Sequence, residues 1–171
     1  MSVSKSYVAG IIINNKYAIY LKRKAIKSKP AKNYPDNKIW SIDLTTLTDE
    51  HKQQNIIFGI IDCGTRANLL LKRIPTKKSS ALILQILEVI KKYGKPAKIR
   101  TDNEPVFTSF LFRTHLKFLH IKHELTELAC PWMNGRIERF FGTLKCSIRK
   151  IVIKSAELDS RLMEFRFYYN H

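Results

Sequence analysis

The chain has 171 residues, which is enough for one ordinary domain and a short extension. Its 44% hydrophobic content supports a buried core and argues against a disordered chain. Lysine and arginine total 31 against 14 aspartates and glutamates, and the net charge of +17 indicates a polyanionic partner, usually nucleic acid. The three cysteines have no CxxC spacing, so we expect neither a disulfide framework nor a zinc finger, which suits a reducing cytoplasm.

The first 37 residues are expected to be a basic N-terminal extension. Tyr7–Leu21 is apolar but interrupted by Asn14, Asn15 and Lys16, so it is too short and too broken to span a membrane. We expect this segment to be buried or to lie at an interface, and we expect no membrane partner. Lys22–Asn37 is basic and contains two prolines, which is typical of a linker or of an arm that contacts nucleic acid.

Residues 38–171 are expected to form the domain proper. Three strands come first, as an antiparallel meander in which the turn signal Cys63-Gly64-Thr65 separates the second strand from the third, and helices then alternate with short strands. This order predicts an α/β fold with a mixed sheet and helices on its faces. The expected strands are Ile39–Thr45, Asn55–Asp62, Arg66–Ile74, Ala97–Thr101 and Ile121–Leu125, and the expected helices are Ser79 or Ser80 to Tyr93, Pro105–Leu119, Gly135 to about Ile153, and Glu157–Tyr169.

Three acidic residues stand at positions where a carboxylate needs an explanation. Asp43 lies inside the first strand, Asp102 directly follows the fourth, and Glu138 lies near the start of the long helix. Strand ends and a helix start can meet at one sheet edge, where three carboxylates would repel one another without a cation. Oxygen ligands select Mg²⁺ or Mn²⁺, and two ions about 3.5–4 Å apart suit phosphoryl transfer.

Spacing alone leaves other interpretations of these acids open. A single strand aspartate is usually held by hydrogen bonds, and a glutamate near a helix start usually favours the helix dipole. Several other acids also compete for the same roles: Asp62, Glu88, Glu104, Glu124, Glu127 and Asp159.

The sequences around the three acids are more specific than their spacing. The segments IWSIDLT, IRTDNEPVFTS and CPWMNGRIERFFGTLK resemble the DDE catalytic core of bacterial insertion-sequence transposases and retroviral-type integrases. Between Asp102 and Glu138 lie 35 residues, which is the spacing of that family. The resemblance covers about residues 38–171. It implies a ribonuclease-H-like fold with a five-stranded mixed sheet, and it makes Asp43, Asp102 and Glu138 the catalytic, metal-binding triad. It also implies cleavage at a DNA end followed by strand transfer.

The neighbours of the triad are candidate DNA contacts. Helical spacing puts Lys145 and Arg149 on the face of Glu138, and similar integrases place a lysine where Lys145 stands. A plain solvated basic stripe is the alternative. The other candidates are Arg136, Asn103, which follows Asp102 as in the family, and Trp132, which could stack on a base or anchor its loop. Glu104 stands where many members have glycine.

The implied partners are transposon-end and target DNA, with the chain acting as a homo-oligomer associated with the bacterial nucleoid. Similar transposases continue past the Y-N-H at 169–171, and no helix-turn-helix is recognisable near the N-terminus. A separate helix-turn-helix protein is therefore a candidate partner. Two alternative functions remain open: a non-catalytic DNA-binding remnant of a transposase and a ribonuclease-H-type nuclease.

Overall fold

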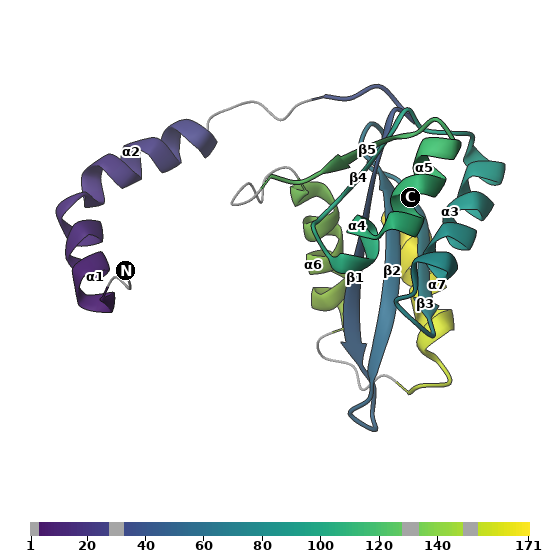
Figure 1. Ribbon diagram of the computed structural model, residues 1–171. Coiled ribbons are helices and arrows are strands. Elements are labelled where there is room, and N and C mark those ends of the chain that lie inside the picture. The colour runs from purple at the N-terminus through teal and green to yellow at the C-terminus, as the bar shows by residue number, and fades with distance from the viewer. Residues whose placement is uncertain (1–3, 28–32, 128–133, 149–153) are drawn as a thin grey trace. The chain divides into compact units, whose positions relative to one another are not determined.

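The computed structural model describes residues 4–27, 33–127, 134–148 and 154–171, without the side chains of 23–27. The chain divides into two units, residues 1–33 and 34–171, which we describe separately. In the first, α1 (Lys5–Asn14) begins where Ser4 Oγ accepts a hydrogen bond from Tyr7 N at 3.2 Å, and α2 (Lys16–Lys27) follows (Figure 1).

The structure shows this segment as helices with exposed apolar side chains. Tyr7, Ile13 and Tyr17 are 64%, 70% and 74% exposed, so these side chains are not buried, and their expected place at an interface stays a prediction. The stretch from Lys22 to Lys27 is helical, and its role as a linker or as an arm that contacts nucleic acid also stays a prediction. Within the described residues, no helix is both long enough and apolar enough to cross a membrane.

The second unit is built on one five-stranded sheet in the order β3-β2-β1-β4-β5. The first three strands form the expected antiparallel meander, while β4 pairs in parallel with both β1 and β5. This is the mixed sheet that the element order predicted. The strands are β1 (Ile39–Thr48), β2 (Gln54–Asp62), β3 (Asn68–Ile74), β4 (Lys98–Thr101) and β5 (Lys122–Leu125).

Helices cover both faces of the sheet, and each face has its own apolar core (Figure 1). Alternation along β1 sends Ile42 and Leu44 to the core under α3 and α5, and Leu47 to the core under α6 and α7. Trp40 is completely buried on the α3 side, and its ring N–H donates to Asn37 Oδ1 at 2.8 Å. The helices are α3 (Ser79–Tyr93), α4 (Pro105–Thr108), α5 (Phe110–Phe118), α6 (Gly135–Ile148) and α7 (Leu158–Asn170).

Helix boundaries differ from expectation in two places. The expected helix Pro105–Leu119 is two helices, because Ser109 is extended and its Oγ caps α5 by accepting from Phe112 N at 3.2 Å. Neither Ser79 nor Ser80 caps α3. Lys78 occupies the N-cap position, and Ser79 Oγ donates to the Val106 carbonyl at 3.0 Å instead.

A glycine ends α3, and aromatic side chains of α7 pack against α6. Gly94 ends α3 at φ 86°, a left-handed conformation that glycine adopts easily, as the sequence predicted. Of the C-terminal aromatic residues, Phe165 and Tyr169 pack against Phe140, whereas Phe167 and Tyr168 are exposed. The expected extension of α6 to Ile153 falls outside the described residues.

Candidate active site

Two adjacent parallel strands carry the two aspartates. Ser41 of β1 pairs with Arg100 of β4, so extending this register by two residues brings Asp102 level with Asp43. Neighbouring strands are roughly 4.8 Å apart, and paired residues of parallel strands point to the same face. Asp43 and Asp102 therefore lie side by side, on the face that α6 covers.

Gly59 lets α6 approach that face closely. It pairs with Asp43 across β1 and β2, and a β-carbon on Gly59 would lie 2.6 Å from Phe141 Cζ. The ring of Phe141 thus occupies the space above the glycine. Glu138 lies one helical turn before Phe141, so this contact carries the glutamate toward Asp43.

The resulting concentration of negative charge is visible in Asp43. Burial, and the nearby carboxylates of Asp102, Glu104 and Glu138, raise its pKa from an ordinary 3.8 to about 7, against a lowering by its hydrogen bond from Leu44 N. That bond is 2.7 Å long and holds Asp43 Oδ1. The three acids singled out from the sequence are therefore electrostatic neighbours, and Glu104 joins them.

The carboxylates are nevertheless not a closed metal cage. Among the described residues, no three acidic, histidine or cysteine side chains are close enough together to hold an ion. Glu138 is exposed, whereas Asp43 and Asp102 are half-buried. Asp102 Oδ1 accepts a hydrogen bond from Glu104 N at 3.0 Å, which fixes the turn after β4.

Glu104 is the member of the cluster that sequence reasoning did not select. It was one of several competing acids, noted for standing where relatives have glycine. Its position two residues after Asp102 was the only available signal, because a turn can bring residues i and i+2 to the same side. Its side chain also pairs with Lys77 at 3.4 Å.

Most of the other competing acids have structural roles. Asp62 accepts hydrogen bonds from the backbone N–H groups of Asn37, Gly64 and Thr65 and from the Thr65 hydroxyl. Asp159 pairs with Arg73 at 2.7 Å. Glu124 pairs at 2.8 Å with Arg100, which is almost fully buried.

The candidate DNA contacts differ in how exposed they are and in which protein groups they contact. Lys145 is exposed on α6, two turns beyond Glu138, whereas Arg136 is half-buried with its guanidinium 5.0 Å from the centre of the Tyr34 ring. Asn103 Nδ2 donates to the Thr126 carbonyl at 2.8 Å, so it also anchors the segment after β5. Trp132 and Arg149 lie outside the described residues. A role in DNA binding stays a prediction for all five.

Comparison with known proteins identifies the fold and the family. The integrase core domain family matches residues 34–131, more than half of the chain. The chain belongs to this family. This integrase core thus has the ribonuclease-H-like fold that the resemblance implied.

Individual relatives are retroviral. The integrase core is 30% identical over 116 residues to the Gag-Pro-Pol polyprotein of Simian retrovirus SRV-2, which covers 67% of this chain. It is 30% identical over 136 residues to that of Mason-Pfizer monkey virus, which covers 79% of this chain. These matches span only 6% and 7% of the polyproteins.

Solved structures agree on the architecture. The HTLV-2 integrase catalytic core domain, solved in complex with magnesium in a dimeric form, has a TM-score of 0.66 at 25% identity and covers 82% of this chain and 90% of its own. The integrase chain of a simian T-cell lymphotropic virus intasome has a TM-score of 0.66 at 21% identity and covers 84% of this chain and 51% of its own, which bears on the fold alone.

Proposed function

We propose that this integrase core cleaves DNA ends and transfers the freed 3′-hydroxyl to target DNA, with Asp43, Asp102 and Glu138 holding one or two divalent ions. The observation that carries the proposal is the placement of Asp43 level with Asp102 on neighbouring parallel strands, where burial and the nearby carboxylates also raise the pKa of Asp43. A group in that state gains the most from a neutralising cation. The donors are all carboxylates, which fits Mg²⁺ or Mn²⁺, and the magnesium complex of the HTLV-2 core supports the same choice.

Bound ions would supply the charge that activates an attacking oxygen and stabilises a leaving one on phosphate. The chain's own residues then have to bind and orient the strand. Lys145, exposed beyond Glu138, suits a phosphate contact, and Arg136 borders the same helix start. Phosphoryl transfer depends on positioning and on charge neutralisation, so no covalent protein nucleophile is needed.

The proposal extends to assembly and substrate. Solved integrase cores occur in dimeric and trimeric forms, which supports a homo-oligomer acting on DNA. Transposon ends are the proposed substrate, and a separate helix-turn-helix protein that recognises them is a proposed partner.

The test is disintegration, which is the reverse of strand transfer. The substrate is a branched oligonucleotide that mimics the strand-transfer product, and the reaction contains Mg²⁺ or Mn²⁺. We expect resolved product with the wild type and none with Asp43→Asn, Asp102→Asn or Glu138→Gln. The control is Glu164→Gln, which removes the same charge from a surface acid paired with Arg161 on α7.

The result would also separate the two alternatives. Salt-sensitive DNA binding without any product, in the wild type as in the variants, would refute catalysis and leave a DNA-binding remnant. Preferential cleavage of an RNA–DNA hybrid would replace strand transfer by a nuclease activity.

A further inference from the structure

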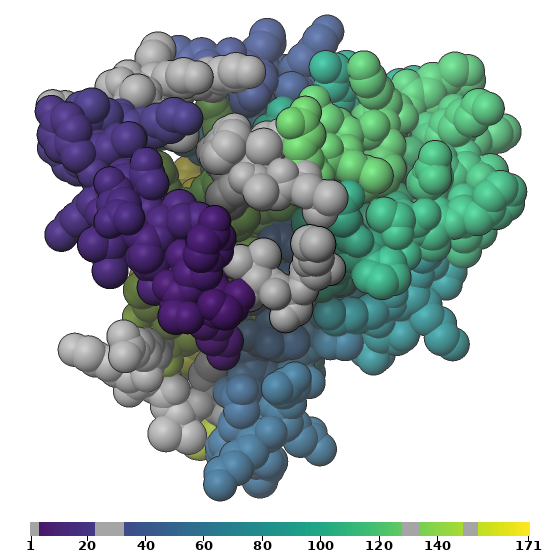
Figure 2. Space-filling view, turned by 60° about the vertical axis from the view of Figure 1, so that its left-hand side comes forward, coloured from purple at the N-terminus to yellow at the C-terminus, as the bar shows by residue number. Residues whose placement is uncertain are grey.

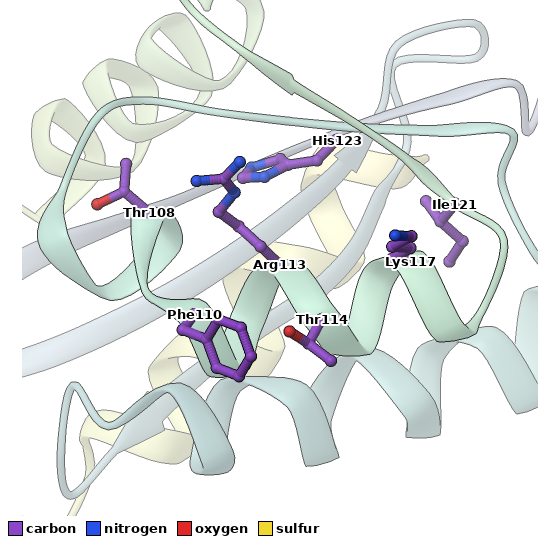
Figure 3. Close-up of a pocket in the computed structure, with 7 residues that line it drawn as sticks. All are labelled: Thr108, Phe110, Arg113, Thr114, Lys117, Ile121 and His123. Carbon is purple, nitrogen blue, oxygen red and sulfur yellow. The ribbon is translucent and has the colours of Figure 1, made fainter.

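A pocket of about 650 Å³ opens between α5 and β5, and the active site does not account for it. Figure 3 shows its lining, and Figure 2 shows the surface of α4 and α5 in green. Four lining residues belong to one face of α5, because their spacing repeats each turn. The lining includes Thr108 of α4, Phe110, Arg113, Thr114 and Lys117 of α5, and His123 of β5.

The chemistry of the lining favours an anion. Among the described residues, the lining contains two cations and two hydroxyl groups but no carboxylate. In the part of the chain that the structure describes, neither Arg113 nor Lys117 forms an ion pair. Figure 3 shows the guanidinium of Arg113 extending toward the imidazole of His123, with Lys117 farther along α5. A phosphate group can take hydrogen bonds from such donors.

An exposed aromatic ring adds a second feature. Phe110 lines the pocket and is 86% exposed, so its ring is accessible to a bound ligand. Cations beside an aromatic ring form the typical surface for single-stranded nucleic acid, where the strand's phosphates meet the cations and a base stacks on the ring.

The pocket also connects to the active site through His123. Thr101 Oγ1 donates its only proton to the Asp102 carbonyl at 2.9 Å, so the 2.9 Å contact with His123 Nε2 requires the imidazole to donate. Burial, and the positive charge of Arg113, lower the pKa of His123, which keeps the ring neutral near pH 7. The wall of the pocket is thus two hydrogen bonds from the backbone of Asp102.

We propose that this pocket is a binding subsite for single-stranded DNA, in which Arg113 and Lys117 bind backbone phosphates and Phe110 stacks on a base. The subsite would hold an unpaired stretch of the strand beside the reacting end. The proposal rests on the proposed function for the identity of the polymer.

The test measures binding of labelled single-stranded and duplex oligonucleotides by fluorescence anisotropy, in EDTA so that no reaction occurs. Phe110→Ala should weaken single-strand binding by about 5- to 100-fold and duplex binding much less. Arg113→Ala with Lys117→Ala should also lower the slope of log K against log salt by about 1.4, from about 0.7 for each phosphate.

Matched controls lie nearby. Phe118→Ala removes a ring from α5 that is 80% exposed but does not line the pocket, and Lys91→Ala removes an exposed cation from α3. We expect wild-type single-strand binding from Phe118→Ala and an unchanged salt slope from Lys91→Ala. Equal losses from Phe110→Ala and Phe118→Ala would overturn the stacking site.

Two further outcomes separate this inference from the proposed function. Inorganic phosphate that binds the wild type but not the double variant, with DNA binding unaffected by the mutations, would show an anion pocket off the DNA path and overturn the subsite. Pocket-dependent DNA binding without strand transfer would support the subsite and refute only the catalytic proposal.

Discussion

Replacing Asp43 with asparagine should stabilise the integrase core in metal-free buffer at pH 8. Asparagine keeps an oxygen that can accept the 2.7 Å hydrogen bond from Leu44 N, and it removes a charge that burial and three nearby carboxylates disfavour. The substitution should therefore leave the fold intact while relieving the repulsion.

The size of the stabilisation by Asp43→Asn follows from the raised pKa of Asp43. A pKa raised from 3.8 to about 7 costs the folded state about 4 kcal/mol once Asp43 is ionised, at about 1.4 kcal/mol for each pKa unit. Below pH 3.8 the group is protonated in both states and costs nothing. Between that pH and about 7 only the unfolded state ionises, so the wild type loses stability as the pH rises. Asparagine carries no such dependence.

The assay is thermal and urea unfolding of both proteins at pH 5 and pH 8 in EDTA. The stability advantage of Asp43→Asn should be about 3 kcal/mol larger at pH 8 than at pH 5, which is roughly 9 °C in Tm for a domain of this size. Added Mg²⁺ at pH 8 should stabilise the wild type, because an ion bound only to the folded state shifts the equilibrium, and should stabilise Asp43→Asn less.

Two results would refute this reasoning. One is a difference between the two proteins that does not change with pH, which would mean that Asp43 titrates normally. The other is a large loss of stability in the variant at pH 8, which would mean that the carboxylate is needed for folding.

Three further predictions concern neighbouring features. Gly59→Ala should lower the free energy of unfolding by about 1–3 kcal/mol and reduce strand transfer, because the added methyl group pushes Phe141, and hence α6, away from β1. Adding Phe141→Leu should restore much of the free energy of unfolding, and unchanged stability in Gly59→Ala would contradict the close contact. Asp62→Ala should lower the free energy of unfolding, measured in urea, by about 2–4 kcal/mol because it leaves several turn N–H groups without an acceptor. Asp159→Ala, at an exposed ion pair, should cost under about 1 kcal/mol, and equal costs would argue against this role of Asp62. Lys145→Gln should leave Tm unchanged and lower the salt slope of duplex binding by about 0.9; an unchanged slope would remove Lys145 from the DNA path.

The sequence by itself determined the order of the strands and the family, because both depend on local patterns. Alternation around Asp43 and the turn signal before Arg66 were sufficient for the meander, and the motifs around Asp102 and Glu138 were sufficient for the family. Local patterns predicted helix ends poorly where a side chain had more than one possible hydrogen-bond partner. Ser79 could have capped α3 but donates to the Val106 carbonyl instead, and Ser109 divides the helix expected over Pro105–Leu119 into two.

Only the tertiary structure decided which distant residues meet. The sequence near Gly59 does not predict that Phe141 will occupy the space above this glycine. This packing brings Glu138 toward the aspartates. The addition of Glu104 to the acidic cluster and the link from His123 through Thr101 to Asp102 also depend on strand register. Periodicity predicts which face of an element is apolar, but the partner of that face is chosen by the packing of the whole domain.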